Sequence, residues 1–155
     1  IRPATVCGYS PRMRLDVTVN MFVYQAIKKK SIEVHGGKQI RPNIHIQDLT
    51  NVYLQFLKNN NLKSGIFNAG FENLSILDIA KKVSKICKCK FKMKKKINDQ
   101  ISYRQNSYKL ISTVFKKMYS IEDAIYELSQ KLKDKTLIPN DTCFTVKYMK
   151  KKDLK

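Results

Sequence analysis

The sequence predicts an α/β fold in which short strands pack among about five helices. Short apolar runs typical of buried strands recur along the chain, and between them apolar residues repeat every three to four positions, as on one face of a helix. The composition agrees, because 43% of the 155 residues are hydrophobic, which supplies a packed core and excludes disorder over most of the chain. No linker is long enough to divide the chain, so we expect residues 1–155 to fold as a single unit.

The first part of the chain alternates between strand and helix patterns. Residues 1–8 predict a short buried strand that runs into a glycine turn. Residues 17–30 carry apolar side chains at helical spacing and end in three lysines, which suit a helix C-terminus. Short strand patterns at 32–34 and 44–46 flank a Gly-Gly turn, and a helix pattern follows over 49–58. The expected N-caps of the two helices are Asp16 and Asp48.

The second part of the chain predicts three further helices and two strands. Two of the helices begin where a Ser is followed three residues later by an Asp, which resembles a capping box. This arrangement occurs at Ser75 and Asp78 and again at Ser120 and Asp123, where the helix should run to about residue 132. The remaining expected elements are strands at 66–70 and 90–93 and a helix over 107–118. No pattern is clear after Pro139.

The strong positive charge does not by itself indicate a nucleic-acid partner. Lys and Arg total 31 against 12 Asp and Glu, a formal net charge of +19. Surfaces that bind nucleic acids favour Arg for bidentate and stacked contacts, whereas nearly all of this charge comes from Lys. We therefore expect a solvated lysine surface and no nucleic-acid partner, and we regard the scarce arginines as better candidates for ligand contacts. These arginines are Arg2, Arg12, Arg14, Arg41 and Arg104.

Residue patterns also argue against several kinds of site. No apolar run reaches the roughly 18 residues of a membrane span, and the glycines form neither a dinucleotide-binding fingerprint nor a P-loop. The cysteines are scattered, which favours a reducing, cytoplasmic location, and the close pair Cys87 and Cys89 has no partner ligands, so no metal site is expected. His35 and His45 fit strand-end histidines bonded to backbone groups better than ligands or bases. No nucleophile–base pair is recognisable, so no catalytic residue is predicted.

The segment from Gly36 to Asp48 is the most informative part of the sequence. A turn presents Gln39 and Arg41, and a short strand then leads to a helix start. An Arg on a loop at the end of such a unit is well suited to a bidentate contact with a phosphate. A surface Arg paired with an acid explains the same pattern equally well.

Four stretches of the chain, taken in order, carry a family resemblance. The stretches are Arg2-Pro3-Ala4-Thr5-Val6-Cys7-Gly8, Ser10 to Asn20, Gly36 to Asp48, and Asp99-Gln100-Ile101-Ser102-Tyr103-Arg104. They resemble the C-terminal half of an extended short-chain dehydrogenase/reductase with a Rossmann-type fold, in the NAD-dependent sugar epimerase/dehydratase family typified by UDP-glucose 4-epimerase. The third stretch has the G-x-x-x-x-R spacing of the family, and the fourth resembles its D-P-R-S-Y segment.

The resemblance implies roles for individual residues. Pro3 and Ala4 would lie near the nicotinamide ring of NAD, which would be bound mainly by a dinucleotide-binding half absent from this chain. Arg41 would hold a phosphate, and Asn20 would bind the diphosphate or nearby sugar oxygens. The full set of residues implied to contact the nucleotide sugar is Thr5, Asn20, Gln39, Arg41, Tyr103 and Arg104. Ile101 stands where the family has a second phosphate-binding Arg, for which Arg104 is the candidate substitute.

The family's catalytic Tyr-x-x-x-Lys pair would precede residue 1. We therefore expect this chain to be the substrate-binding half of an enzyme that oxidises its sugar transiently, and to be inactive alone. A homodimer of the complete protein is possible, and this chain gives no basis for predicting it. We also expect exposed apolar surface around residues 1–8 and 44–57, where the absent half would pack. The alternative is a non-catalytic remnant or basic binding module that retains the pocket fold, which would bind polyanions with a steep salt dependence.

Overall fold

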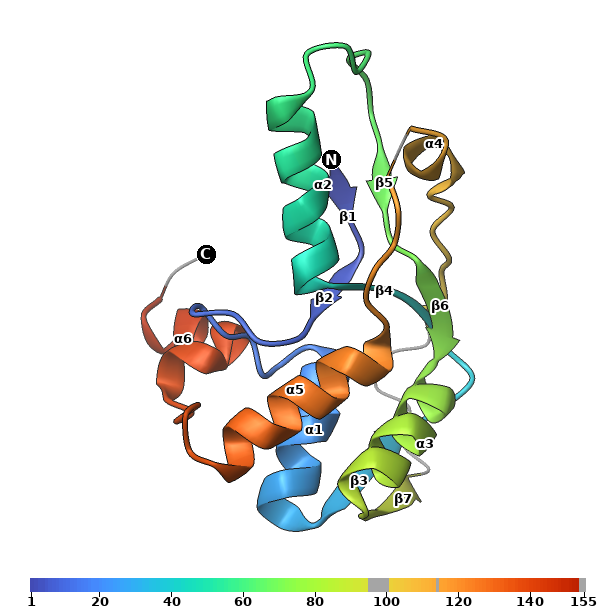
Figure 1. Ribbon diagram of the computed structural model, residues 1–155. Helices are drawn as coiled ribbons and strands as arrows, with labels where there is room; N and C mark the ends of the chain where they lie inside the picture. The colour runs from blue at the N-terminus through green and yellow to red at the C-terminus, as the bar shows by residue number, and fades with distance from the viewer. Residues whose placement is uncertain (95–100, 114, 154–155) are drawn as a thin grey trace.

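The computed structural model describes residues 1–94, 101–113 and 115–153, and it confirms the predicted α/β fold class (Figure 1). The strands are β1 (Arg2–Pro3), β2 (Thr5–Cys7), β3 (Ser31–His35), β4 (Ile40–His45), β5 (Asn68–Ala69), β6 (Glu72–Ser75) and β7 (Lys90–Lys94). The helices are α1 (Thr18–Lys29), α2 (Ile46–Lys58), α3 (Ile76–Cys87), α4 (Tyr108–Ile111), α5 (Ile121–Lys133) and α6 (Thr145–Lys151), with a 3-10 turn η1 (Asp141–Cys143) before α6.

Strand β4 is the middle strand of the largest sheet. It pairs in parallel with β2 and antiparallel with β6, giving the order β2-β4-β6. The short strands β1 and β5 pair in parallel, as do β3 and β7. Only Ala4 separates β1 from β2, and its N–H donates to the carbonyl of Ala69 at 2.8 Å, so residues 2–7 run as one extended segment past β5 and then β4.

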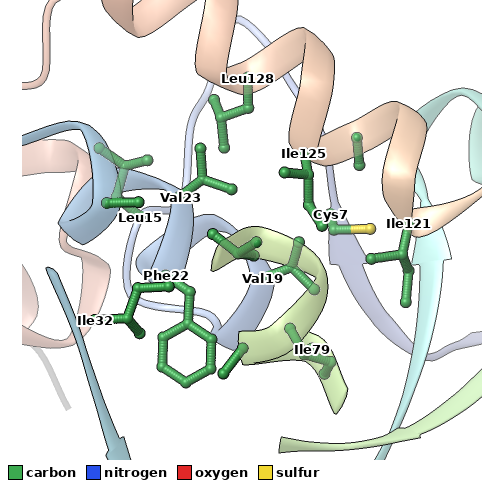
Figure 2. Close-up of a cluster of buried hydrophobic side chains, with 14 of the residues drawn as sticks. Cys7, Leu15, Val19, Phe22, Val23, Ile32, Ile79, Ile121, Ile125 and Leu128 are labelled. Carbon is green, nitrogen blue, oxygen red and sulfur yellow. The ribbon is translucent and has the colours of Figure 1, made fainter. Parts of the chain in front are cut away.

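Two hydrophobic clusters lie at opposite ends of this segment. Helices α1, α3 and α5 pack around the larger cluster together with β3, while α2, β5 and α4 enclose the smaller one (Figure 1). Figure 2 shows that Val19 and Val23 of α1 face Ile125 and Leu128 of α5 inside the larger cluster. The buried residues of the smaller cluster are Ile44, Leu49, Val52, Phe67, Ala69, Leu110 and Phe115.

Of the four predicted N-caps, two are confirmed and two are wrong. Ser120 forms a capping box with Asp123, and Ser75 accepts a hydrogen bond from the Asp78 N–H at 3.0 Å, so both serine caps are confirmed. Asp16 does not cap α1. Its carboxylate accepts the N–H of Val146 at 2.9 Å, which ties the loop before α1 to the start of α6.

Asp48 is a buried anchor and not an N-cap. It lies in the first turn of α2 and is fully buried. Its carboxylate accepts the N–H groups of Met118 and Tyr119, each at 3.1 Å, so it holds the segment that leads into α5. The N-cap of α2 is His45, whose Nδ1 accepts the Gln47 N–H at 3.0 Å. The His45 ring stacks on Tyr119 with the ring centroids 4.8 Å apart.

The predicted helix over 107–118 is much shorter in the structure. It is helical only over α4, and position 114 of the pattern lies outside the described residues. The Met118 and Tyr119 N–H groups bond to Asp48, so they do not form helical bonds along the chain. Strand β6, turn η1 and helix α6 were not predicted, because their sequences are polar or lysine-rich and lack a clear apolar period.

The expected exposed apolar surface is present on one face of α2. Ile44, Leu49 and Val52 are buried, whereas Tyr53 is 46% and Leu57 is 77% exposed. Leu54 of α2 is also exposed. In residues 1–8, Pro3 is exposed, Ile1, Ala4 and Val6 are half-buried and Cys7 is buried, so this stretch exposes less apolar surface than we expected.

Replacing Asp48 with Asn should destabilise the fold strongly. The substitution keeps the shape but removes a buried charge and one of the two acceptors for the Met118 and Tyr119 N–H groups, so we expect the free energy of unfolding to fall by about 2 kcal/mol. Urea denaturation of the purified chain measures this. Glu33→Gln is the control, because its ion pair with Lys94 is exposed and should change the value by less than about 1 kcal/mol. Equal effects of the two substitutions would contradict the anchoring role of Asp48.

His45 should make stability depend on pH near neutrality. Burial lowers the pKa of His45 below its ordinary value of 6.5, opposed in part by the carboxylates of Glu127, Asp48 and Asp123. Because the unfolded chain then binds the proton more readily, the full stabilisation is present above pH 6.5 and is lost as the pH falls below it, by at most about 1.4 kcal/mol per pH unit.

Urea unfolding at pH 7.5, 6.5 and 5.5 tests this dependence. His45→Asn keeps a side-chain acceptor at the N-cap but does not titrate, so its free energy of unfolding should change less over this range than that of the wild type. Parallel curves for the two proteins would assign the dependence to other groups.

Candidate functional site

A first pocket of about 340 Å³ opens where β2 ends and α1 begins. Three residues implied by the resemblance, Ala4, Thr5 and Asn20, line it. The loop between β2 and α1 supplies much of the remaining wall. The other lining residues are Val6, Gly8, Ser10, Arg12, Arg14, Val17 and Ile46.

Asn20 holds the wall of this pocket in place. It is buried, its Oδ1 accepts the N–H of Gly8 at 3.1 Å, and its Nδ2 donates to the carbonyl of Arg14 at 2.9 Å. Gly8 has a φ of 102°, and a Cβ there would lie 3.1 Å from the side chain of Ile46, so the turn needs glycine. The two hydrogen bonds of the Asn20 amide therefore fix the Asn20 side chain and the loop relative to each other.

Two arginines of this loop line the first pocket and differ in their contacts. The guanidinium of Arg12 donates to the carbonyl of Met13 at 2.9 Å and approaches Oγ1 of Thr145 at 3.3 Å, so it joins the loop to α6. Arg14 donates from Nε to Asp16 at 3.0 Å. Sequence reasoning gave neither arginine a role. The available signal was that arginine is rare in this chain.

A second pocket of about 390 Å³ lies beside the opposite face of α1. It contains Gln39 and Arg41, together with Thr18, Met21 and Gln25 of the helix. The remaining lining residues are Phe22, Glu33, His35 and Ile76. The side chain of Gln39 closes the Gly-Gly turn, accepting the Gly37 N–H at 2.7 Å and approaching the carbonyl of His35 at 3.4 Å.

Arg41 and Tyr103 come together at the rim of this second pocket. The guanidinium carbon of Arg41 lies 5.3 Å from the centroid of the Tyr103 ring, a cation–π contact. The Ile40 N–H donates to Oγ of Ser102 at 3.0 Å, and the Tyr103 N–H donates to the carbonyl of Ile40 at 3.3 Å. The described part of the fourth stretch thus packs on the start of β4, while Asp99 and Gln100 lie outside the described residues.

The other implied residues lie apart from Arg41. Arg104 lines a third, wider pocket of about 690 Å³ with Phe71, Asn73 and Gln105. Pro3 is exposed on β1. The structure therefore brings together Ala4, Thr5 and Asn20 in one pocket and Gln39, Arg41 and Tyr103 at another, but not Arg104 with either group.

The first turn of α1 lies between the first and second pockets. Val17 and Asn20 face the first pocket, whereas Thr18 and Met21 face the second. The N-cap residue Val17 makes no side-chain cap bond, and the first turn contains no acidic residue. The N–H groups at a helix start carry partial positive charge and favour an anion. The geometry is suited to an elongated ligand with an anionic centre and a different group in each pocket.

Other chemistry has less support in the described residues. No group of three or more His, Cys, Asp or Glu in the described part of the chain is placed to hold a metal ion. All four cysteines are free, and burial raises the pKa of the Cys7 thiol to about 12 and that of Cys87 to about 11, which disfavours reactive thiolates. None of the described helices is long and apolar enough to cross a membrane.

The spacing of the family's catalytic pair does occur within this chain. Tyr24 and Lys28 have it in α1, and Tyr148 and Lys152 have it at the end of α6. The Tyr24 ring packs edge-on against Phe144, with the centroids 5.4 Å apart, and Lys28 is exposed. Neither pair contributes to the first or second pocket, so neither carries the family's catalytic role at these pockets.

No family model matches the sequence. Among solved structures, RMD from Pseudomonas aeruginosa, complexed with NADPH, matches 86% of the chain with a TM-score of 0.72 and 15% identity. UDP-N-acetylglucosamine 4-epimerase from Bacillus cereus matches 85% with a TM-score of 0.71 and 21% identity. UDP-glucuronic acid 4-epimerase from Bacillus cereus, in complex with UDP-glucuronic acid and NAD, matches 86% with a TM-score of 0.68 and 22% identity.

The chain spans less than half the length of these proteins, covering 48%, 47% and 44% of them respectively. The matches run over most of this chain, and they confirm the expected fold. The chain therefore has an α/β fold similar to part of each of these three proteins.

Proposed function

We propose that this chain is the substrate-binding C-terminal half of an NAD-dependent nucleotide-sugar epimerase or dehydratase. The main support for the proposal is the position of the α1 start between two pockets, one lined by Ala4, Thr5 and Asn20 and the other by Gln39 and Arg41. The fold likeness to nucleotide-sugar epimerases supports it. The diphosphate would lie over the first turn of α1, with the sugar in the first pocket and the nucleoside in the second.

The second pocket suits a nucleoside diphosphate. Arg41 lies at the rim with its Nη1 donating to the carbonyls of Ile40 and Ile101, so a phosphate would meet the remaining part of a guanidinium held in place by the backbone. The Tyr103 ring beside it offers an aromatic face. Gln25 and Gln39 line the same pocket with polar amide groups, whose oxygens accept the N–H groups of Glu33 at 3.0 Å and Gly37 at 2.7 Å. We therefore assign the nucleotide to the side of α1 that faces Arg41.

The first pocket suits a sugar. Thr5 and Ser10 bring hydroxyl groups that can donate to or accept from sugar hydroxyls, and Ala4 and Val6 form an apolar wall. Asn20 would act mainly by positioning, since both ends of its amide already bond to the loop. A phosphate over the helix start would then meet backbone N–H groups and not the Asn20 amide.

NAD would be held mainly by residues outside this chain. The sequence has no Gly-rich dinucleotide loop, so Pro3 and Ala4 are the residues proposed to approach the nicotinamide. Gly70 packs directly against Ala4, because a Cβ at position 70 would lie 2.6 Å from the Cβ of Ala4. When bound, NAD would supply hydride acceptance and return; this chain would contribute a flat, apolar edge against the ring and hold the sugar beside it.

Replacing Arg41 with Gln should weaken binding of UDP to the 155-residue chain by about tenfold or more. The reason is that a hydrogen bond to a charged group contributes about 1.5–3 kcal/mol. Isothermal titration calorimetry at fixed salt measures the affinity. Unchanged thermal melting would show that the Arg41 substitution leaves the fold intact.

Arg2→Gln is the matched control for this experiment. It removes one positive charge from exposed β1, away from the first and second pockets, and should leave UDP affinity within about twofold. Unchanged affinity in Arg41→Gln would show that the pocket is assigned wrongly. Equal weakening by both substitutions, with a steep loss at higher salt, would favour the alternative of a basic binding module.

A further inference from the structure

The first pocket has an excess of positive charge that a neutral sugar does not use. Arg12 and Arg14 both line it, although arginines are scarce in the chain, and none of the described residues that line it is acidic. The rest of the wall is apolar or carries hydroxyl groups, except for the Asn20 amide, which is bonded to the loop. In the proposed binding mode, the diphosphate contacts the start of α1 and Arg41. A second anionic group on the ligand would account for the additional guanidinium.

Arg14 is the arginine suited to bind a second anionic group on the ligand. Its salt bridge to Asp16 uses Nε and is 3.0 Å long, which leaves the two Nη groups for a planar acceptor. The Asp16 carboxylate itself accepts the Val146 N–H at 2.9 Å, so the carboxylate that binds Arg14 Nε is held in place. The side chain of Arg14 remains 48% exposed.

Arg12 is committed to the protein itself. Its Nη1 donates to the Met13 carbonyl at 2.9 Å, and both Nη groups approach Oγ1 of Thr145 at 3.3 Å. These contacts tie the loop to α6 and occupy the end of the guanidinium that a ligand would need. Arg12 therefore supports the pocket wall while Arg14 faces the ligand.

We infer that the substrate is a nucleotide sugar acid, whose carboxylate on the sugar binds bidentately to Arg14. The inference rests on the proposed function, because it takes the first pocket as the sugar pocket. A carboxylate matches the planar fork of a guanidinium, and the pair gains strength in a pocket with apolar walls. A competing arrangement, in which Arg14 binds the diphosphate, predicts no discrimination between acidic and neutral sugars.

UDP-glucuronic acid and UDP-glucose separate these arrangements, because they differ only in a carboxylate against a hydroxymethyl group. Calorimetry with the 155-residue chain at 150 mM salt should show UDP-glucuronic acid binding about tenfold more tightly. Arg14→Gln should reduce the ratio of the two affinities to near one. Arg2→Gln, which removes the same charge from exposed β1, should keep the wild-type ratio and thereby exclude a general effect of net charge.

Three results would overturn the inference, and they differ in whether they also contradict the proposed function. Equal affinity of the wild type for both ligands, or equal weakening of both by Arg14→Gln, removes only the sugar-acid assignment and leaves nucleotide-sugar binding in place. If UDP and both UDP-sugars fail to bind a wild-type chain that melts cooperatively, the proposed function fails as well.

Discussion

The hydrogen bonding of strand β4 is the constraint on which both clusters and the first and second pockets depend. Its partners β2 and β6 come from distant parts of the sequence, and its buried Asn43 side chain donates to the carbonyls of Arg41 at 2.8 Å and Glu72 at 3.3 Å. One end of β4 presents Arg41 to the second pocket, and the other end passes directly into α2 through His45. A shift of this strand by one residue would therefore move Arg41 and the start of α2 together.

The loop before α1 is shaped from both sides. Asn20 bonds to it from inside the helix, and Asp16 and Arg12 connect it to the start of α6. The C-terminal tail thus supports the wall of the first pocket, although it lies more than 120 positions away in the sequence. Phe144 strengthens this link, because its ring packs edge-on against Tyr24 of α1. The proposed site consequently depends on nearly the whole length of the chain.

Local signals in the sequence were enough for the parts of the fold that local forces determine. The caps at Ser75 and Ser120 bond to residues three positions away, and both were predicted. Asp48 was misjudged because its partners lie 70 and 71 positions away, where no local pattern points to them. The candidate site was also predicted only in part. The resemblance implied Arg41 and Tyr103, which the structure brings together. Residue spacing alone could not show that Arg14 lines a pocket while Arg12 contacts α6.

We propose that the start of α1, between the two pockets, binds the diphosphate. Nitrogen-15 NMR of the labelled chain tests this site, with UDP and then uridine as ligands. We expect UDP to shift the amide signals of Gly8 and of residues 18–20, and uridine, which has no phosphates, to leave them in place while still affecting residues near Gln39. Phosphate-dependent shifts confined to the lysine-rich strand β7, with the α1 start unchanged, would contradict it.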